Sequence, residues 1–202
     1  MESDNIAFDS DEHFHLALKA MEDGLTDTAI LHLKRLLNMD PEHGRAHYLL
    51  GALYAEIRLF SRAIDEMKSA VELEPDLTTA RFQLGLLYAT SGMVNDAEDT
   101  WTALDELGEN NPLFVFKRGL MHLLHDEFES CSEDLTKGIQ LNRVNPALNN
   151  DMLRIVQTIG QLVGTNNLSD SAAQDSQPTD SDGRHILLSA YQTSEYDKDT
   201  EH

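Results

Sequence analysis

The chain has 202 residues, a length typical of one domain with room for an extension. It contains 15 Lys and Arg residues against 36 Asp and Glu residues, which gives a formal net charge of −21. A surface this acidic repels phosphate backbones and anionic lipids, which argues against binding to nucleic acids or membrane surfaces. The single cysteine, Cys131, excludes a disulfide within the chain.

The amino-terminal sequence does not have the pattern of a secretion signal. Residues 1–5 read Met-Glu-Ser-Asp-Asn, whereas a signal peptide begins with basic residues followed by an apolar run. No window approaches the roughly 18 consecutive apolar residues that a membrane-spanning helix needs. We therefore expect a cytoplasmic protein that binds neither membranes nor nucleic acids.

Residue types recur along the chain with a period of 34 residues. Small and aromatic residues both follow this period, each at its own phase. They are the glycines Gly51, Gly85 and Gly119, the alanines Ala29, Ala63 and Ala97, and the aromatic residues Phe14, Tyr48, Phe82 and Phe116. A fixed period of this length indicates a repeat architecture. The period divides the chain into four units, 10–43, 44–77, 78–111 and 112–145.

Each unit contains two amphipathic stretches with the helical period. In the second unit, apolar residues spaced by three and four positions occupy 48–54 and 63–73. Turn-forming pairs separate such stretches, as at Asp23-Gly24, and Asp40-Pro41 ends the first unit. No segment shows the sustained alternation typical of a strand. The sequence therefore predicts an all-α fold of four helix–turn–helix units.

The second unit combines a Leu-Gly pair, a tyrosine, spaced alanines and a final proline. These residues are Leu50, Gly51, Tyr54, Ala63, Met67, Ala70 and Pro75. The pattern resembles the tetratricopeptide repeat (TPR), and the resemblance extends over residues 10–143. It implies a right-handed α-solenoid of stacked units whose terminal units are atypical. The fourth unit departs at the positions of Leu, Tyr, Ala and Ala, which hold Arg118, His122, Cys131 and Gly138.

Beyond the fourth unit, the sequence predicts a capping helix and a disordered acidic tail. Residues 146–163 carry an apolar stripe at helical spacing, suited to covering the open end of the stack. Residues 164–202 are rich in Ser, Asp, Thr, Asn and Gln, and such a segment cannot offset the entropy of ordering. Residues 1–9 are expected to be flexible. Within the tail, residues 185–191 form an apolar island.

The sequence contains no pattern typical of an active site. It has neither a glycine-rich phosphate loop nor a Gly-x-Ser-x-Gly element. His122 and His125 are close in sequence, but His122 occupies the place of a packing tyrosine in the neighbouring units. Cys131 takes the place of the repeated alanine, which favours a buried filler over a reactive thiol. We therefore expect no catalysis, no cofactor and no bound metal.

Function is then expected on the surfaces of the solenoid. The TPR resemblance implies that the first helix of each unit lines a concave groove that binds a protein partner. The residues carried over to this groove are Phe14, Leu18, Arg45, Tyr48, Ala52, Phe82, Gln83, Leu86, Phe116, Lys117 and Leu120. Because most of them are apolar, we expect an exposed strip that accepts an apolar segment or an amphipathic helix. Two basic residues, Arg45 and Lys117, are too few for the carboxylate clamp of some family members.

Two functions fit these features. The first is a non-enzymatic adaptor that binds a partner protein in the groove. The alternative is a dedicated cytosolic chaperone for a secretion- or pilus-type client subunit, which would be soluble only when co-expressed with this protein. For the island 185–191, three hypotheses stand: it docks intramolecularly in the groove or on a neighbouring surface until a partner displaces it, it stays free, or it binds a separate partner.

Overall fold

The computed structural model of the chain describes residues 9–169, 183 and 186–187. Within this part, every element of secondary structure is helical, which confirms the predicted all-α class. The flexibility expected for residues 1–8 and for most of the tail concerns positions outside the described residues. In the described part, no helix is long and apolar enough to cross a membrane.

Helices begin at the same place in every repeat. The first helices are α1 (Ser10–Glu22), α3 (Gly44–Glu56), α5 (Thr78–Thr90) and α7 (Pro112–Leu124). The second helices are α2 (Thr26–Met39), α4 (Phe60–Leu73), α6 (Val94–Thr102) and α8 (Phe128–Leu141). A 3₁₀ helix, η1 (Ala103–Leu107), continues α6, and α9 (Pro146–Ser169) follows α8. Both sets of starting positions step by 34 residues, so the sequence period is also the structural period.

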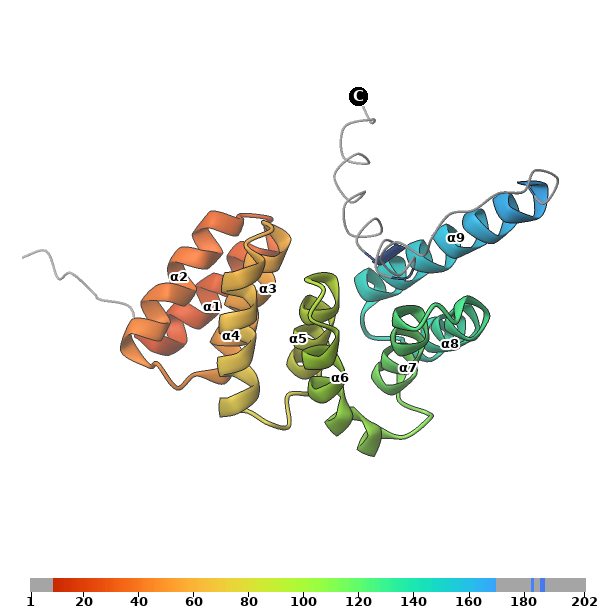
Figure 1. The fold of residues 1–202 in the computed structure, drawn as a ribbon. Coiled ribbons are helices and arrows are strands. Elements are labelled where there is room, and N and C mark those ends of the chain that lie inside the picture. Colours follow the sequence, from red (N-terminus) through yellow and green to blue (C-terminus); the bar gives the residue numbers. More distant parts are fainter. Residues whose placement is uncertain (1–8, 170–182, 184–185, 188–202) are drawn as a thin grey trace, which may run out of the picture. The chain divides into compact units, whose positions relative to one another are not determined.

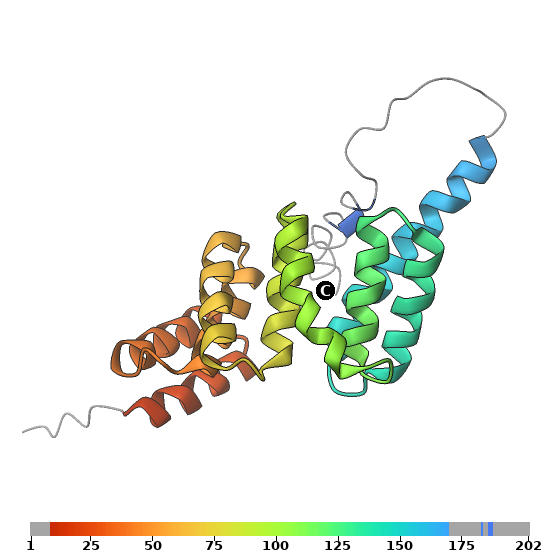
Figure 2. The same cartoon turned by 60° about the horizontal axis from the view of Figure 1, so that its bottom comes forward.

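The chain divides into two compact units, Met1–Leu87 and Tyr88–His202. In the first unit, α1 packs against α2, α2 against α3 and α3 against α4, so two hairpins lie side by side (Figure 1). In the second unit, α7 packs against α8 and α8 against α9 (Figure 2). The second unit begins at Tyr88, near the end of α5, and continues with α6 and η1, both of which contact α7. The hairpins α1–α2 and α3–α4 therefore pack within the first unit and the hairpin α7–α8 within the second, whereas the boundary between the units falls inside α5.

The turn between the two helices of a repeat uses a left-handed backbone conformation every time. Its φ angles are 69° at Gly24, 60° at Arg58, 78° at Gly92 and 61° at Asp126. The sequence predicts turns at the two glycines, which adopt this conformation without strain. The other two positions hold larger side chains, for which the left-handed region costs about 1 kcal/mol or more. Arg58 and Asp126 therefore form the same turn at a higher conformational cost.

The helices of a hairpin cross closely at small residues. A Cβ atom on Gly51 would lie 3.0 Å from Met67 Cγ, and a Cβ atom on Gly119 would lie 2.8 Å from Leu135 Cδ2. The residues at the repeated alanine position are fully buried, namely Ala29, Ala63, Ala97 and Cys131. These contacts agree with the expectation that a larger side chain would force the paired helices apart.

The third repeat differs from the others in its second helix. α2, α4 and α8 have 14 residues each, whereas α6 has nine and is continued by the five residues of η1. Pro41 and Pro75 stand two residues after α2 and α4, but the third repeat has no proline before Pro112. Its helix ends instead at Gly108, which has a φ of 72°. Asn111 then caps α7 by accepting the N–H of Leu113 at 2.9 Å.

The predicted capping helix is present as α9, which packs on α8. On its apolar stripe, Met152, Ile155 and Ile159 are buried, whereas Leu162 near the end is 41% exposed. The helix continues to Ser169 rather than ending at 163 as expected. A single glycine at position 164 does not end the helix, because glycine costs only about 1 kcal/mol relative to alanine there.

Three asparagines hold the turn between α8 and α9. Asn142 is 8% exposed, and its Nδ2 donates to the carbonyl of Asn145 at 2.9 Å and to Asn149 Oδ1 at 2.8 Å. Its Oδ1 accepts the N–H groups of Val144 and Asn145, both at 3.2 Å. Asn145 in turn caps α9 by accepting the N–H of Leu148 at 3.0 Å. The buried amide is thus fully paired, which fixes the start of the capping helix.

In the first hairpin, His13 of α1 faces His32 of α2. Their Nδ1 atoms lie 2.9 Å apart, and His13 is only 5% exposed. One ring nitrogen must donate and the other accept, so at least one ring is neutral. Burial, followed by the charges of His13 and Arg35, lowers the pKa of His32. Protonation of His32 therefore opposes folding of this hairpin.

Replacement of His32 by glutamine is expected to reduce the acid sensitivity of the chain. Above the ordinary histidine pKa, near 6.5, the folded and unfolded chains both hold His32 neutral and its contribution to stability is complete. As the pH falls below that value, His32 is protonated in the unfolded chain but stays neutral in the folded chain. The free energy of unfolding therefore decreases until the pH reaches the lowered pKa of His32 in the folded chain. Urea unfolding at pH 7.5 and 5.0 should show a smaller loss for His32→Gln than for the wild-type chain. His15→Gln, at an exposed position on α1, is the control and should keep the wild-type loss; equal losses in all three proteins would contradict the prediction.

Candidate functional site

Five of the predicted partner-binding residues lie on α1 and α3 in the unit Met1–Leu87. Phe14 and Leu18 of α1 and Tyr48 and Ala52 of α3 are half-buried, and Arg45 is exposed. We call the four apolar and aromatic residues, Phe14, Leu18, Tyr48 and Ala52, the first-helix face. The repeat places Phe14 and Tyr48 at one phase and Leu18 and Ala52 at another, one helical turn later.

The aromatic residues of the first-helix face connect successive first helices. The Phe14 ring lies 5.0 Å from the ring of His43, which caps α3 by accepting the N–H of Ala46 at 3.1 Å. Tyr48 makes a hydrogen bond with Thr79 at the start of α5. Burial raises the pKa of Tyr48, and the bond with Thr79 opposes this change. Within Met1–Leu87, α1, α3 and the start of α5 therefore form one row.

The basic residue of this row is already paired. The backbone N–H of Arg45 donates to Glu74 Oε1 at 3.0 Å, and its Nε lies 3.6 Å from Glu74 Oε2. The Arg45 side chain is 70% exposed, so this ion pair contributes little stability. Glu74 locally neutralises the positive charge of Arg45, a residue that was predicted from the sequence to bind the partner.

The predicted residues on α5 are less accessible than expected. Phe82 is 1% exposed and Leu86 is 8% exposed, whereas Gln83 is half-buried. An exposed apolar strip was expected at these positions from the sequence, and for Phe82 and Leu86 that expected exposure was wrong. Which residues of an amphipathic helix are buried depends on the elements that pack against it. The hydrophobic period of the sequence alone does not reveal those neighbours.

The predicted residues on α7 are also buried. Phe116 and Leu120 have no exposed surface, so the exposure expected for them was wrong as well. The reason at Phe116 is Gly138 of α8, because a Cβ atom at Gly138 would lie 3.2 Å from Phe116 Cγ and closer still to its ring edge. Glycine at that position lets the phenyl ring pack inside the α7–α8 hairpin. Lys117 donates to Asp105 Oδ1 at 2.5 Å and is likewise engaged.

An ion pair between α7 and α8 was not predicted from the sequence. Arg118 Nε donates to Asp134 Oδ2 and its terminal nitrogen donates to Asp134 Oδ1, both at 2.6 Å. Asp134 is 8% exposed. His122, expected to be a packing residue, instead contacts Glu127 and lies 3.7 Å from Asp134 Oδ2. The available signal was Arg118 itself, a charge at a repeat position that holds leucine in the second and third units.

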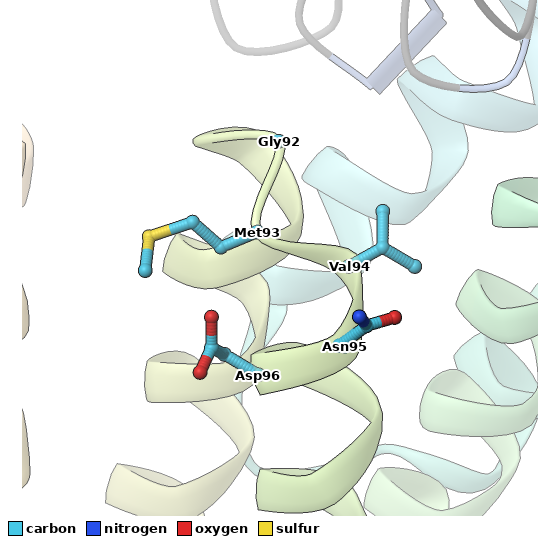
Figure 3. A pocket seen from close by; sticks show the side chains of 5 residues that line it. All are labelled: Gly92, Met93, Val94, Asn95 and Asp96. Carbon is cyan, nitrogen blue, oxygen red and sulfur yellow. The ribbon is translucent and has the colours of Figure 1, made fainter.

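The described residues offer little for catalysis. No group of three His, Cys, Asp or Glu side chains among them is placed to hold a metal ion. Burial raises the pKa of Cys131 to about 12, so its thiolate is not populated near neutral pH. A small hollow at the start of α6 is lined by consecutive residues, Gly92 to Asp96. Figure 3 shows Met93 and Asp96 on one side of this turn and Val94 and Asn95 on the other, so the side chains do not converge on a ligand.

Comparison with known proteins gives structural likeness without sequence matches. No family model and no curated protein sequence matches the chain. MamA from residue 41 to its end, from Desulfovibrio magneticus RS-1, superposes with a TM-score of 0.58 at 11% identity, over 92% of this chain and 97% of that chain. A crystal structure of MamA protein gives a TM-score of 0.53 at 19% identity, over 91% of this chain and 92% of that chain.

YrrB, a TPR protein with an unusual peptide-binding site, matches 78% of this chain and 92% of its own at 18% identity. Its TM-score of 0.33 is too low to carry weight. MamA is also a TPR protein, and at these identities the likeness to it concerns the fold alone. Together with the 34-residue spacing of the helix starts, it shows that the chain has a TPR-like fold.

Proposed function

We propose that the chain is a non-enzymatic protein-interaction module that binds an apolar segment of a partner on the first-helix face. The observation that carries this proposal is the half-buried state of Phe14, Leu18, Tyr48 and Ala52. Phe14 and Tyr48 contact residues at the start of the next first helix, and all four side chains keep part of their surface open to water. A partner that covers this surface gains the free energy of removing apolar area from water.

The charges around this face favour an apolar or basic partner segment over an acidic one. The chain has a net charge of −21, and Arg45 is neutralised by Glu74. An acidic segment would meet general repulsion and would have to displace Glu74 from Arg45. Binding by a dedicated chaperone uses the same surface, and that alternative differs from the adaptor only in the solubility of the client.

The proposal is tested with peptides selected from a random 12-residue library displayed on phage, using the full chain as bait. Leu18→Glu combined with Ala52→Glu places two carboxylates on the first-helix face. This double variant is expected to weaken binding of the selected peptides at least tenfold, because each lost apolar contact is worth about 1–2 kcal/mol. Fluorescence anisotropy measures the affinity, and circular dichroism confirms that the helices persist.

The matched control carries the same two added charges on the second helices. Leu31 of α2 and Leu73 of α4 are 47% and 39% exposed, so Leu31→Glu with Leu73→Glu changes the net charge equally without touching the first-helix face. The control should bind the peptides as the wild-type chain does. If both double variants weaken binding to the same extent, or if neither does, the first-helix face is not the binding surface.

A further inference from the structure

A short segment of the tail contacts the end of α7. The N–H of Gly183 donates to Asp126 Oδ1 at 2.7 Å, although 57 residues separate the two in sequence. Asp126 belongs to the turn that joins α7 to α8, and its own N–H donates to the carbonyl of Leu123 at 3.1 Å. Both partners of the contact lie in the unit Tyr88–His202.

Gly183 fits this place because it has no side chain. A Cβ atom there would overlap the carbonyl oxygen of Leu123 and would lie 2.8 Å from its carbonyl carbon. These are backbone atoms of the last turn of α7, which cannot move aside as a flexible side chain can. The approach of the tail to α7 therefore depends on glycine at position 183.

Three positions after Gly183, two adjacent aliphatic residues are buried. Ile186 is 2% exposed and Leu187 has no exposed surface. Both belong to the apolar island that the sequence analysis noted in an otherwise polar and acidic tail. Burial of two adjacent aliphatic side chains supplies an apolar contribution to docking, beside the hydrogen bond at Gly183.

The residue that accepts this hydrogen bond, Asp126, is unusual for its position in the turn between α7 and α8. Asp126 occupies the left-handed turn position that Gly24 and Gly92 fill in the first and third repeats. Aspartate has a higher conformational free energy than glycine in this backbone conformation. It also supplies a carboxylate, which accepts the hydrogen bond from the N–H of Gly183. Hydrogen bonds to a charged acceptor are stronger than those between neutral groups.

We propose that Gly183, Ile186 and Leu187 of the tail form a ligand of the α7 end that the chain itself carries. It docks through three features: a glycine N–H on the Asp126 carboxylate, the absence of a side chain against Leu123, and an adjacent aliphatic pair. This proposal goes beyond the interaction function proposed above, because the α7 end is a different surface from the first-helix face. A partner that binds the α7 end must displace the segment and supply the same chemistry, a glycine followed three positions later by two adjacent aliphatic residues.

The test uses a fluorescein-labelled synthetic peptide with the sequence of residues 181–191 and the full-length chain. Gly183→Val places a branched side chain against the Leu123 carbonyl and should release the chain's own segment. The labelled peptide is expected to bind Gly183→Val at least tenfold more tightly than the wild-type chain, whose site is occupied. Gly160→Val is the matched control, because a Cβ atom at Gly160 meets no atom within 4 Å apart from its chain neighbours and the backbone of its own helix, and it should exclude the peptide as the wild-type chain does.

A receptor variant tests the contact from the other side. Asp126→Gly removes the carboxylate and keeps the turn, since glycine serves at the same position in two other repeats. In the Gly183→Val background, Asp126→Gly should weaken peptide binding about tenfold. Equal peptide affinity for the wild-type and Gly183→Val chains, or no binding to either, would overturn the proposal. A wild-type dimer that Gly183→Val abolishes in sedimentation would also overturn it, because the segment would then dock on a second copy.

Failure of this proposal can be separated from failure of the proposed function. Leu18→Glu with Ala52→Glu alters α1 and α3 and leaves the α7 end unchanged. In the Gly183→Val background, this double variant should bind the labelled tail peptide with unchanged affinity, whatever its effect on peptides selected from the library.

Discussion

Replacement of Gly119 by leucine is expected to lower the free energy of unfolding by about 3 kcal/mol, at the upper end of the usual cost of overpacking. Gly119 lies where α7 crosses α8, and a Cβ atom there would already be 2.8 Å from Leu135 Cδ2 and 3.2 Å from Asp134 Cβ. Leucine adds three further carbon atoms, for which the crossing has no room. Thermal unfolding should show a decrease of roughly 6–12 °C in Tm, at 2–4 °C per kcal/mol for a chain of this size.

Gly160→Leu is the matched control for this substitution. Gly160 lies within α9 in the same unit and is exposed, and apart from its chain neighbours and the backbone of α9 no atom lies within 4 Å of the position of a Cβ. Leucine there should stabilise the chain by about 0.5–1 kcal/mol, because it has a higher helix propensity than glycine. Similar effects of the two substitutions would mean that helix propensity, and not the close crossing, governs the glycine positions.

Replacement of Arg118 by methionine is expected to destabilise the chain by about 2 kcal/mol, because it leaves the Asp134 carboxylate buried without its two strongest hydrogen bonds. Methionine keeps most of the apolar stem of arginine, so the loss reflects the charge and its hydrogen bonds. Urea denaturation at neutral pH measures the change.

The double variant Arg118→Met with Asp134→Leu separates two explanations of that loss. If the cost comes from the unpaired carboxylate, removal of both partners should recover most of the stability, since apolar pairs often replace buried ion pairs without loss. Destabilisation of the double variant by the sum of the two single effects would instead show that each residue acts independently.

The repeat itself was predictable because each position of the period has a mechanical reason. Glycine and alanine recur with the 34-residue period where helices cross. This period predicts the starts of α1, α3, α5 and α7 at Ser10, Gly44, Thr78 and Pro112. The left-handed turns at Arg58 and Asp126 were not identified as breakers, because neither residue is one that signals such a turn.

The candidate site was only partly predictable. The periodicity identifies which residues share a face of a helix, and α1 and α3 do present the first-helix face. It does not reveal what covers that face elsewhere. Phe116 is buried because position 138, on another helix, is a glycine. In the same way, the partner of Arg118 is a carboxylate 16 residues away across the hairpin, and no local pattern connects the two.

The buried thiol gives this chain an intrinsic kinetic reporter. Cys131 is the only cysteine, has no exposed surface, and lies in the α7–α8 hairpin with its pKa raised to about 12. An alkylating reagent therefore modifies it only while that hairpin is open, and one labelled site accounts for all of the incorporated mass. The modification rate, measured by mass spectrometry under native conditions, reports the population of the open hairpin when reclosing is faster than alkylation, and the opening rate when alkylation is faster.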